Sequence, residues 1–465
     1  MNVDVSKRAA LVIAVIAGFL FPFLSSAINI ALPTIGREFS MNAVVLGWVN
    51  NAYLITGAAF LVSVGRLADI YGRRKIFLYG NLLFIVVSFL CAVSNSTALF
   101  ITARALGGLS GSVMMATATA ILTSVFPPRE RGRAIGIQIA AAFLGISMGP
   151  FLGGVLTQYL GWQSIFYICA LLGLVIIVLA GWKLRGEWAD ARGERFDVVG
   201  SIAFSLSLIL IIYGLTQLTS ALGIVFVLPG LLGMLIFVWW EGKVEHPVLN
   251  LDLFRRNRVF VFSNLAALII SSAGYAVPFL FSLYLQYNRG LSPSAAGLVL
   301  LASTAVQALV SPVAGRLSDR FEPRKIAATG MAISCMALVI FAFLTEETAL
   351  GLILVGMCIF GTGMALFVSP NANAVMSSVD KRFLGVASGV MGTMRTFGFS
   401  LNMAIVMMLF SVYIGQAEIT PEYYPAFLLS TRVVFAISAI LCLCSVLAQL
   451  AAREKPGSVR NPAGD

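Results

Sequence analysis

Acidic residues and histidine are scarce in this chain of 465 residues, which has 20 Asp and Glu and a single histidine, His246, in a predicted loop. Only 11% of the residues are charged, whereas charged residues make up about 25% of a soluble domain. With 59% hydrophobic residues, the chain cannot hide its apolar side chains in water, which excludes a soluble protein. The six cysteines lie in apolar stretches and form no C-x-x-C pair, so we expect no disulfide and no metal site.

The sequence does contain many apolar stretches of about 20 residues, the length that an α-helix needs to cross a bilayer. Only closed hydrogen-bonded structures survive in lipid, and the alternating pattern of a membrane barrel is absent. We therefore predict an all-α membrane protein with fourteen transmembrane helices. They are expected at about 9–32, 44–64, 76–95, 98–123, 134–158, 163–182, 198–218, 221–240, 259–286, 293–314, 325–344, 348–376, 384–413 and 425–451.

Basic residues alternate between the two sides of these stretches. Of the Lys and Arg residues, 26 occupy the two ends of the chain and every second connection, and only Arg37 and Arg289 lie in the other connections. The positive-inside rule places the 26 in the cytoplasm. We therefore expect a multi-pass plasma-membrane protein with both termini cytoplasmic. The net charge of +11 then serves orientation and contact with membrane lipid, and it indicates no nucleic acid.

An internal repeat divides the chain. The segment GRLADIYGRRK at 65–75 recurs as GRLSDRFEPRK at 315–325, and the distance between the copies fits eight stretches rather than six. Parallel repeats of six helices are typical of transporters that rock around a central site. We predict an N-terminal six-helix half at 1–184, two inserted helices at 185–258 that pack at the periphery, a C-terminal six-helix half at 259–451 and a cytoplasmic tail at 452–465.

At these residues the sequence resembles the major facilitator superfamily and, within it, the fourteen-span drug:proton antiporters. The first copy matches the family's loop signature G-x-L-x-D-x-x-G-R-R, and the second has Glu322 in place of a glycine. The resemblance implies alternating access and a conformational latch in the repeated loop. Its residues are Gly65, Asp69, Gly72, Arg73, Arg74, Gly315, Asp319 and Arg324. The alternative is that the arginines only orient the protein.

Small residues in the fifth stretch have the spacing G-x8-G-x3-G-P-x2-G-G, which looks like the antiporter signature of this family. They are Gly136, Gly145, Gly149, Pro150, Gly153 and Gly154. The resemblance implies that this helix seals the interface between the halves and favours exchange over leak. The alternative is ordinary close packing of small residues.

Three arginines and no acids lie within the predicted stretches: Arg104, Arg395 and Arg432. A charge inside the membrane costs roughly 3 kcal/mol or more, so it indicates function by default. Arg432 is near a helix end and is expected to reach the interface, whereas Arg395 is either functional or bonded to neighbouring carbonyls. Arg104 matches a family arginine implicated in proton movement, but Leu24 stands where the resemblance implies an aspartate. Protons would then have to use interfacial acids such as Glu38, Asp69 or Asp319.

Polar, aromatic and methionine residues at midspan are the candidate lining of the substrate or proton pathway, with packing as the alternative for each. Beside Arg104 and Arg395 they are Ser26, Asn29, Asn51, Tyr53, Met115, Gln138, Tyr275, Gln307, Asn371 and Asn402. We predict a monomeric, cofactor-free secondary transporter, not an enzyme, that exports amphipathic small molecules with protons as the coupling ion. The alternatives are an organic-anion carrier or uncoupled facilitator, and a membrane sensor that transports nothing.

Overall fold

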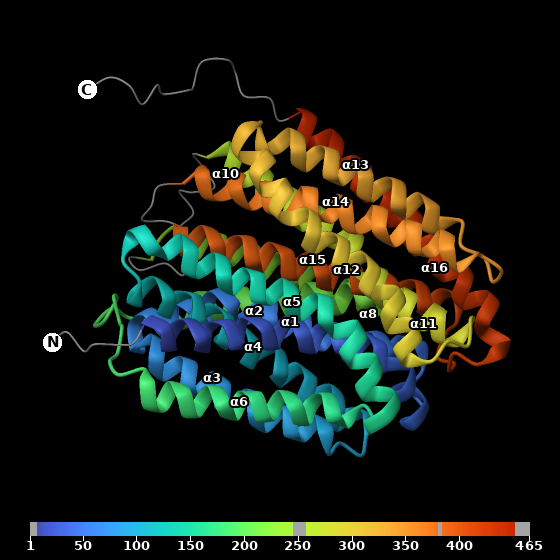
Figure 1. The fold of residues 1–465 in the computed structure, drawn as a ribbon, viewed down its shortest axis with the longest axis horizontal. Coiled ribbons are helices and arrows are strands. Elements are labelled where there is room, and N and C mark those ends of the chain that lie inside the picture. The colour runs from blue at the N-terminus through green and yellow to red at the C-terminus, as the bar shows by residue number, and fades with distance from the viewer. Residues whose placement is uncertain (1–6, 245–256, 380–383, 452–465) are drawn as a thin grey trace.

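The computed structural model describes residues 7–244, 257–379 and 384–451, and this part of the chain forms a bundle of long helices (Figure 1). Fourteen helices are long and apolar enough to cross a membrane, which confirms the predicted number. The first eight are α1 (Lys7–Glu38), α2 (Ala43–Tyr71), α3 (Arg73–Ala92), α4 (Thr97–Val125), α5 (Pro128–Leu160), α6 (Gln163–Lys183), α7 (Val198–Thr216) and α8 (Ala221–Glu241). The others are α10 (Arg258–Gly274) with α11 (Ala276–Tyr287), α12 (Pro293–Arg320), α13 (Pro323–Ala342), α14 (Leu350–Ser377), α15 (Leu384–Tyr413) and α16 (Tyr424–Ala451). His246 and the tail at 452–465 lie outside the described residues.

Local sequence explains several of the helix ends. The Asn42 side chain accepts a hydrogen bond from the Val45 backbone N–H, and Asp197 does the same for Gly200. Such N-caps satisfy backbone donors that a helix leaves free. Gly72 separates α2 from α3 at φ +112°, and Gly161 separates α5 from α6 at φ +82°. Both angles are in the region that favours glycine, which accounts for two of the sharp turns.

The helices pack in two groups that contact each other along several helix pairs. In the first helix group, α1–α6, α1 packs on α4, α5 and α6, and α4 also contacts α2 and α3. In the second helix group, α10–α16, α14 packs on α12 and α13, while α10 packs on α15 and α16. The groups meet where α1 contacts α11, α2 contacts α15 and α5 contacts α12. The division of the chain at 184 and 258 stays a prediction.

The two helices between these groups differ in position. Helix α8 packs on α7 and exposes most of its apolar surface, as expected at the periphery. Helix α7 contacts both α2 and α15. The Ser205 hydroxyl donates to the Ala59 carbonyl at 2.7 Å, and Ile212 packs with Ile55 and Ala404 in one buried cluster. The expectation of a peripheral helix is therefore wrong for α7, which bridges the two helix groups.

The predicted helix at 259–286 is broken at Tyr275, between α10 and α11. Pro278 explains the break, because proline lacks the N–H and its ring clashes with the carbonyl four residues before it, here that of Gly274. The Ala276 backbone N–H instead donates to the Asn402 side-chain oxygen of α15 at 2.6 Å. A side chain of a neighbouring helix thus satisfies the backbone at the break, as broken membrane helices require.

Candidate functional site

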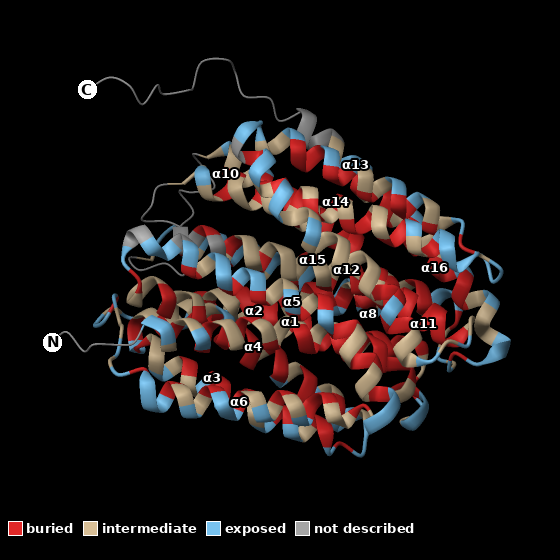
Figure 2. Cartoon of the chain, viewed as in Figure 1, coloured by how far each residue is buried: buried red, intermediate tan, exposed pale blue. Residues whose placement is uncertain are grey.

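The hydrogen bonds between the two helix groups lie at midspan or on one side of the bundle. We call the side where α1 ends at Glu38 the far side, and the side where α1 begins at Lys7 the terminal side. Figure 2 shows buried residues gathered around α11 on the far side. Among the described residues, no hydrogen bond joins the two helix groups in the terminal-side third of the bundle. The bundle is therefore closed on the far side.

A buried polar network closes the far side between α1, α2 and α11. The Asn50 amide donates to the Asn29 side-chain oxygen at 2.5 Å, and the Ser282 hydroxyl donates to the Asn29 carbonyl at 2.6 Å. Gln286 donates to the Ile30 carbonyl at 3.0 Å. These four side chains are at most 7% exposed. Hydrogen bonds are strong in such low-dielectric surroundings, so the network holds the two groups together.

Glycines of α5 allow close contact with α1. A Cβ atom at Gly149 would lie 2.6 Å from the Ser26 Cβ, and one at Gly153 would lie 2.8 Å from the Ala27 Cα. One at Gly145 would lie 2.5 Å from the Phe19 carbonyl oxygen. These distances are below van der Waals contact, so each position requires glycine. Three of the predicted signature positions thus face a helix of the same group.

Other residues of the signature face the second helix group. A Cβ atom at Gly154 would lie 2.5 Å from the Pro293 carbonyl oxygen of α12, and one at Gly297 would meet the Pro150 carbonyl. Ser294 at the start of α12 donates to the Gln158 side chain at 2.5 Å. Apart from the chain neighbours and the nearby backbone of the same helix, no described atom lies within 4 Å of the Cβ position at Gly136. Helix α5 therefore lies between the two groups, with small residues on both of its faces.

Tyr275 joins the groups at midspan. Its hydroxyl lies 3.0 Å from the Ser25 hydroxyl of α1, and its ring stacks on Phe399 of α15 with 4.4 Å between the centroids. Arg395 is one helical turn from Phe399 and is half-buried. Among the described residues, the Arg395 guanidinium has neither a carboxylate partner nor a hydrogen bond. The bonds to neighbouring carbonyls that were one interpretation of this residue are thus absent from the described part of the chain.

The other predicted lining residues are spread over both groups. The structure gives partners to three of them: Ser26 donates to the Ile146 carbonyl at 2.9 Å, Asn51 contacts the Met407 sulfur at 3.8 Å and Gln138 accepts from Thr119 at 3.1 Å. Asn371 is buried on α14, Gln307 is half-buried on α12 and Met115 is 39% exposed on α4. The structure therefore brings Tyr275, Asn402 and Arg395 together around Phe399, and it leaves Gln138 and Asn371 elsewhere.

Arg104 is enclosed within the first helix group. It is 1% exposed, its Nε donates to the Val49 carbonyl at 3.0 Å, and its guanidinium carbon lies 4.2 Å from the centre of the Tyr53 ring. Leu24, 3% exposed, lines the same small space as Arg104. The position at which the resemblance implies an aspartate therefore lies beside Arg104. Among the described residues, the Arg104 side chain has no hydrogen bond to the second helix group.

The loop after α2 contains the predicted acid–base pair. The Arg73 guanidinium donates to the Asp69 carboxylate at 2.7 and 2.9 Å and to the Ser124 hydroxyl at 2.6 Å. Arg73 also pairs with Asp190 at 2.9 Å. In the second copy, the side chain of Asp319 lies outside the described part of the structure, and Lys325 pairs with Glu322 at 3.1 Å. Whether these loops act as a latch stays a prediction.

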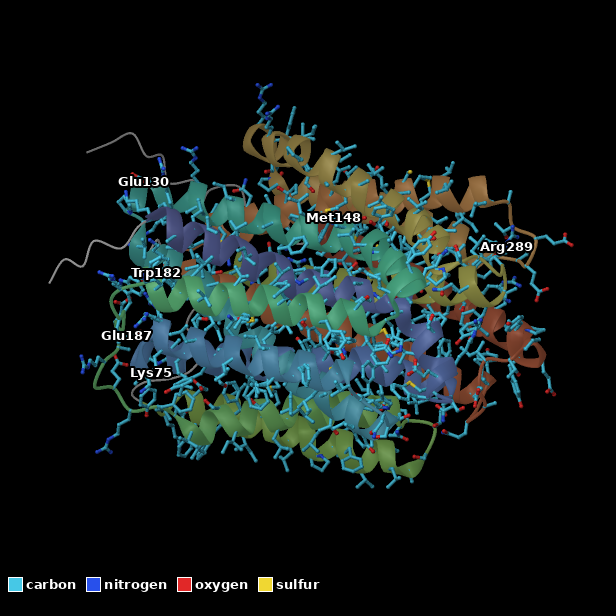
Figure 3. All side chains as sticks on the ribbon, turned by 60° about the horizontal axis from the view of Figure 1, so that its bottom comes forward. Lys75, Glu130, Met148, Trp182, Glu187 and Arg289 are labelled. Carbon is cyan, nitrogen blue, oxygen red and sulfur yellow. The ribbon has the colours of Figure 1, made fainter. Side chains whose placement is uncertain are left out.

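The connection at 185–197 covers this loop, which the sequence analysis missed. The Glu187 carboxylate accepts from the backbone N–H groups of Arg74 at 2.8 Å and Lys75 at 3.1 Å, at the start of α3. Figure 3 shows Lys75 and Glu187 at the same end of the bundle. Arg66 pairs with Glu194. The three acids between 187 and 194 that face a basic loop were the available signal.

Two further charged residues lie where the membrane would end on the far side. Arg432, half-buried, donates to the Ala342 carbonyl at the end of α13 at 3.2 Å. The Trp162 ring nitrogen donates to the Glu38 carboxylate at 2.6 Å. Arg432 thus contacts the last residue of a neighbouring helix, at the depth expected for a residue that reaches the interface.

Comparison with known proteins adds independent information. The model of the family described as Major Facilitator Superfamily matches residues 14–401 and, in a second match, 263–465. The riboflavin transporter RibZ of Clostridioides difficile is 29% identical over 95% of this chain and 96% of its own. The multidrug resistance protein Stp of Mycobacterium tuberculosis is 33% identical over 84% of this chain and 73% of its own. The cephamycin export protein CmcT of Amycolatopsis lactamdurans is 32% identical over 98% of this chain and 95% of its own.

Solved structures match at the level of the fold. A peptide transporter superposes with a TM-score of 0.70 at 14% identity, over 95% of this chain and 94% of that one. An inward-facing bacterial homologue of the human lysosomal transporter Spinster superposes with a TM-score of 0.65 at 18% identity. The superposition covers 97% of this chain and 99% of that one.

Proposed function

Because the chain belongs to the Major Facilitator Superfamily, we propose that it is a secondary transporter that exports amphipathic small molecules by alternating access. Two relatives more than 30% identical are named for multidrug resistance and cephamycin export, which supports efflux. The observation that carries the mechanism is the one-sided closure. The groups are tied together by the buried Asn29 network on the far side, and no hydrogen bond between described residues ties them on the terminal side.

The moving parts are the predicted halves at 1–184 and 259–451, with the inserted pair at 185–258. When both termini are in the cytoplasm of a plasma-membrane protein, the terminal side is the cytoplasmic side. Closure on the far side then corresponds to a state that is open to the cytoplasm. Substrate enters from the terminal side and leaves when the Asn29 network and the α5–α12 contacts separate. We propose that the protein acts as a monomer, because both of the halves that rock around a central site belong to one chain.

The chemistry at midspan fits an amphipathic ligand. Tyr275 and Phe399 offer a stacked aromatic wall, and the Ser25 and Tyr275 hydroxyls offer hydrogen bonds at its edge. Apolar walls with a few placed polar groups are typical of small-molecule sites. The ligand's apolar part packs on the rings, and its polar part contacts the hydroxyls or Arg395.

Proton exchange is proposed as the driving reaction, with Glu38 and Asp69 as the exchanging groups at the two ends. These carboxylates already bind Trp162 and Arg73, respectively. Both contacts lie inside the first helix group, one at each end of it. Protonation of the acid would weaken each contact, which links the proton to the conformational change.

A second candidate, an organic-anion carrier, is favoured by one observation. Arg395 is half-buried at midspan with no carboxylate or hydrogen-bond acceptor among the described residues. A guanidinium in this position is well suited to bind a carboxylate or phosphate group.

Transport by proteoliposomes that enclose a pH dye distinguishes these functions. Cationic and anionic amphiphiles are added in turn under an imposed pH gradient. Proton release driven by a cationic compound supports proton-coupled drug export. Movement of anions alone supports the second candidate, movement without protons indicates a facilitator, and no movement of any solute indicates a sensor.

A further inference from the structure

Arg104 is a buried charge without a counter-ion among the described residues. It is 1% exposed, one of the largest fully buried side chains of the protein. Within the described part of the chain, it donates to the Val49 carbonyl and lies over the face of the Tyr53 ring, and its Nη2 atom is buried with no hydrogen-bond partner. A cation–π contact contributes about 0.5–2 kcal/mol, far less than the cost of burying an ion alone. The charge therefore requires another neighbour.

A small space lined in part by Arg104 lies within the first helix group. The volume of this cavity is about 10 Å³, which is about the space that one water molecule needs. Its wall is contributed by α1, α3, α4 and α6 and is formed by Leu24, Phe84, Val87, Ser88, Cys91, Ala103, Arg104, Gly107 and Phe166. The space thus fits a single particle and excludes a carboxylate, sulfate or phosphate.

The wall suits an anion better than a water molecule. A buried water needs two to four polar partners, including acceptors for its own hydrogens. Here the wall is mostly apolar, and the polar side chains in it are Arg104, a pure donor, and the hydroxyl of Ser88 and thiol of Cys91. Ser88 is buried, and its hydroxyl has no hydrogen bond within the described part of the chain. None of the wall residues is acidic, so nothing in the wall balances the positive charge of Arg104, which favours an anion over a neutral water molecule.

We propose that this space is a binding site for a single monatomic anion, chloride under ordinary conditions, which neutralises Arg104. Leu24 lines the same space, so no carboxylate from α1 performs this task, and the ion takes its place. The site lies inside one helix group and apart from Tyr275, Phe399 and Arg395. The proposal therefore does not depend on which substrate is carried.

The melting temperature of the purified protein tests the site, measured after long equilibration in chloride, bromide, sulfate or gluconate at equal ionic strength. A ligand that binds only the folded state stabilises it by mass action. We expect a saturable rise in melting temperature with chloride and bromide, and none with sulfate or gluconate. Equal effects of all four salts would overturn the proposal.

Substitutions of Leu24 supply matched controls. Leu24→Asp places a carboxylate beside Arg104, so the variant should lose the halide-dependent rise in melting temperature, whereas the neutral Leu24→Asn should keep it. Arg395→Met, a change of an arginine outside the space, should also keep it. A halide effect that survives in Leu24→Asp, or that disappears in Arg395→Met, would contradict the assignment.

Diffraction from crystals grown in bromide tests the same site without a variant. We expect an anomalous peak next to the Arg104 guanidinium. Density there without an anomalous signal would identify a water molecule and overturn the proposal, as would an empty space.

Discussion

The Asn402 side-chain oxygen accepts a hydrogen bond from the Ala276 backbone N–H at 2.6 Å, so α15 holds the break between α10 and α11. The two residues are 126 positions apart in the chain. Tyr275, at the break, reaches α1 through Ser25 and α15 through Phe399. A movement of α15 relative to α10 and α11 would therefore displace the ring that lies between the helix groups.

Removal of this acceptor should destabilise the protein. Asn402→Leu leaves the Ala276 N–H buried and unpaired, which costs about 1–3 kcal/mol, and we expect a lower melting temperature and slower transport. Asn371→Leu is the control for stability, because the Asn371 side-chain oxygen is buried without a partner in the described structure. Equal decreases of the melting temperature in the two variants would show that the hydrogen bond to the Ala276 N–H does not contribute to stability.

The glycines of α5 should respond to alanine with opposite signs. Gly149→Ala puts a methyl group 2.6 Å from the Ser26 Cβ, and such overpacking costs about 1–3 kcal/mol. Gly136→Ala adds a methyl group that meets no described atom within 4 Å apart from its chain neighbours and the nearby backbone of its own helix, and alanine in place of a helical glycine stabilises by about 0.4–1 kcal/mol. Melting temperatures of both variants in the same detergent check this. An unchanged melting temperature of Gly149→Ala would contradict this, because it would mean that α1 and α5 can move apart without a loss of stability.

The Glu187 carboxylate should protect the start of α3. Glu187→Gln removes the charge that two backbone N–H groups contact, and a negative charge at a helix N-terminus is worth about 0.3–1 kcal/mol. Hydrogen–deuterium exchange at 73–76 should become faster in this variant. Glu130→Gln is the control, because its pair with Lys7 is about half exposed and contributes little. Unchanged exchange at α3 in Glu187→Gln would contradict the described contact.

Arg395 should determine the charge of the preferred substrate. Arg395→Met removes the unpaired guanidinium, and the loss of a charge-assisted hydrogen bond, about 1.5–3 kcal/mol, should raise the KM of an anionic amphiphile tenfold or more. The KM of a neutral amphiphile should stay within a factor of about three. Arg395→Lys keeps the charge and should lose less. A KM for the anion that does not change would exclude Arg395 from substrate binding.

Much of the architecture could be predicted because hydropathy and charge act locally. The fourteen spans follow from run lengths, and the resemblance indicated that Leu24 and Arg104 belong to one site, which the structure places around one small space. The break at Tyr275 was missed, because the apolar run continues through Pro278. The bridging position of α7 and the contact of Glu187 with α3 could not be predicted, since they depend on which distant surfaces meet. Hydropathy indicates which segments cross the membrane, but it does not indicate which helices pack against each other.

The most direct test of alternating access is a reversible lock on the far side. Gln158 and Ser294 are hydrogen-bonded at 2.5 Å across α5 and α12, so a Gln158→Cys/Ser294→Cys pair in a background without the native cysteines should be joined by a short bifunctional thiosulfonate, whose bonds to the two sulfurs a reductant cleaves. Transport by proteoliposomes is then measured before cross-linking, after it and after reduction. The account predicts that transport stops when the pair is cross-linked and returns when it is reduced. Transport that continues at the full rate while mass spectrometry shows the cross-link complete would contradict it.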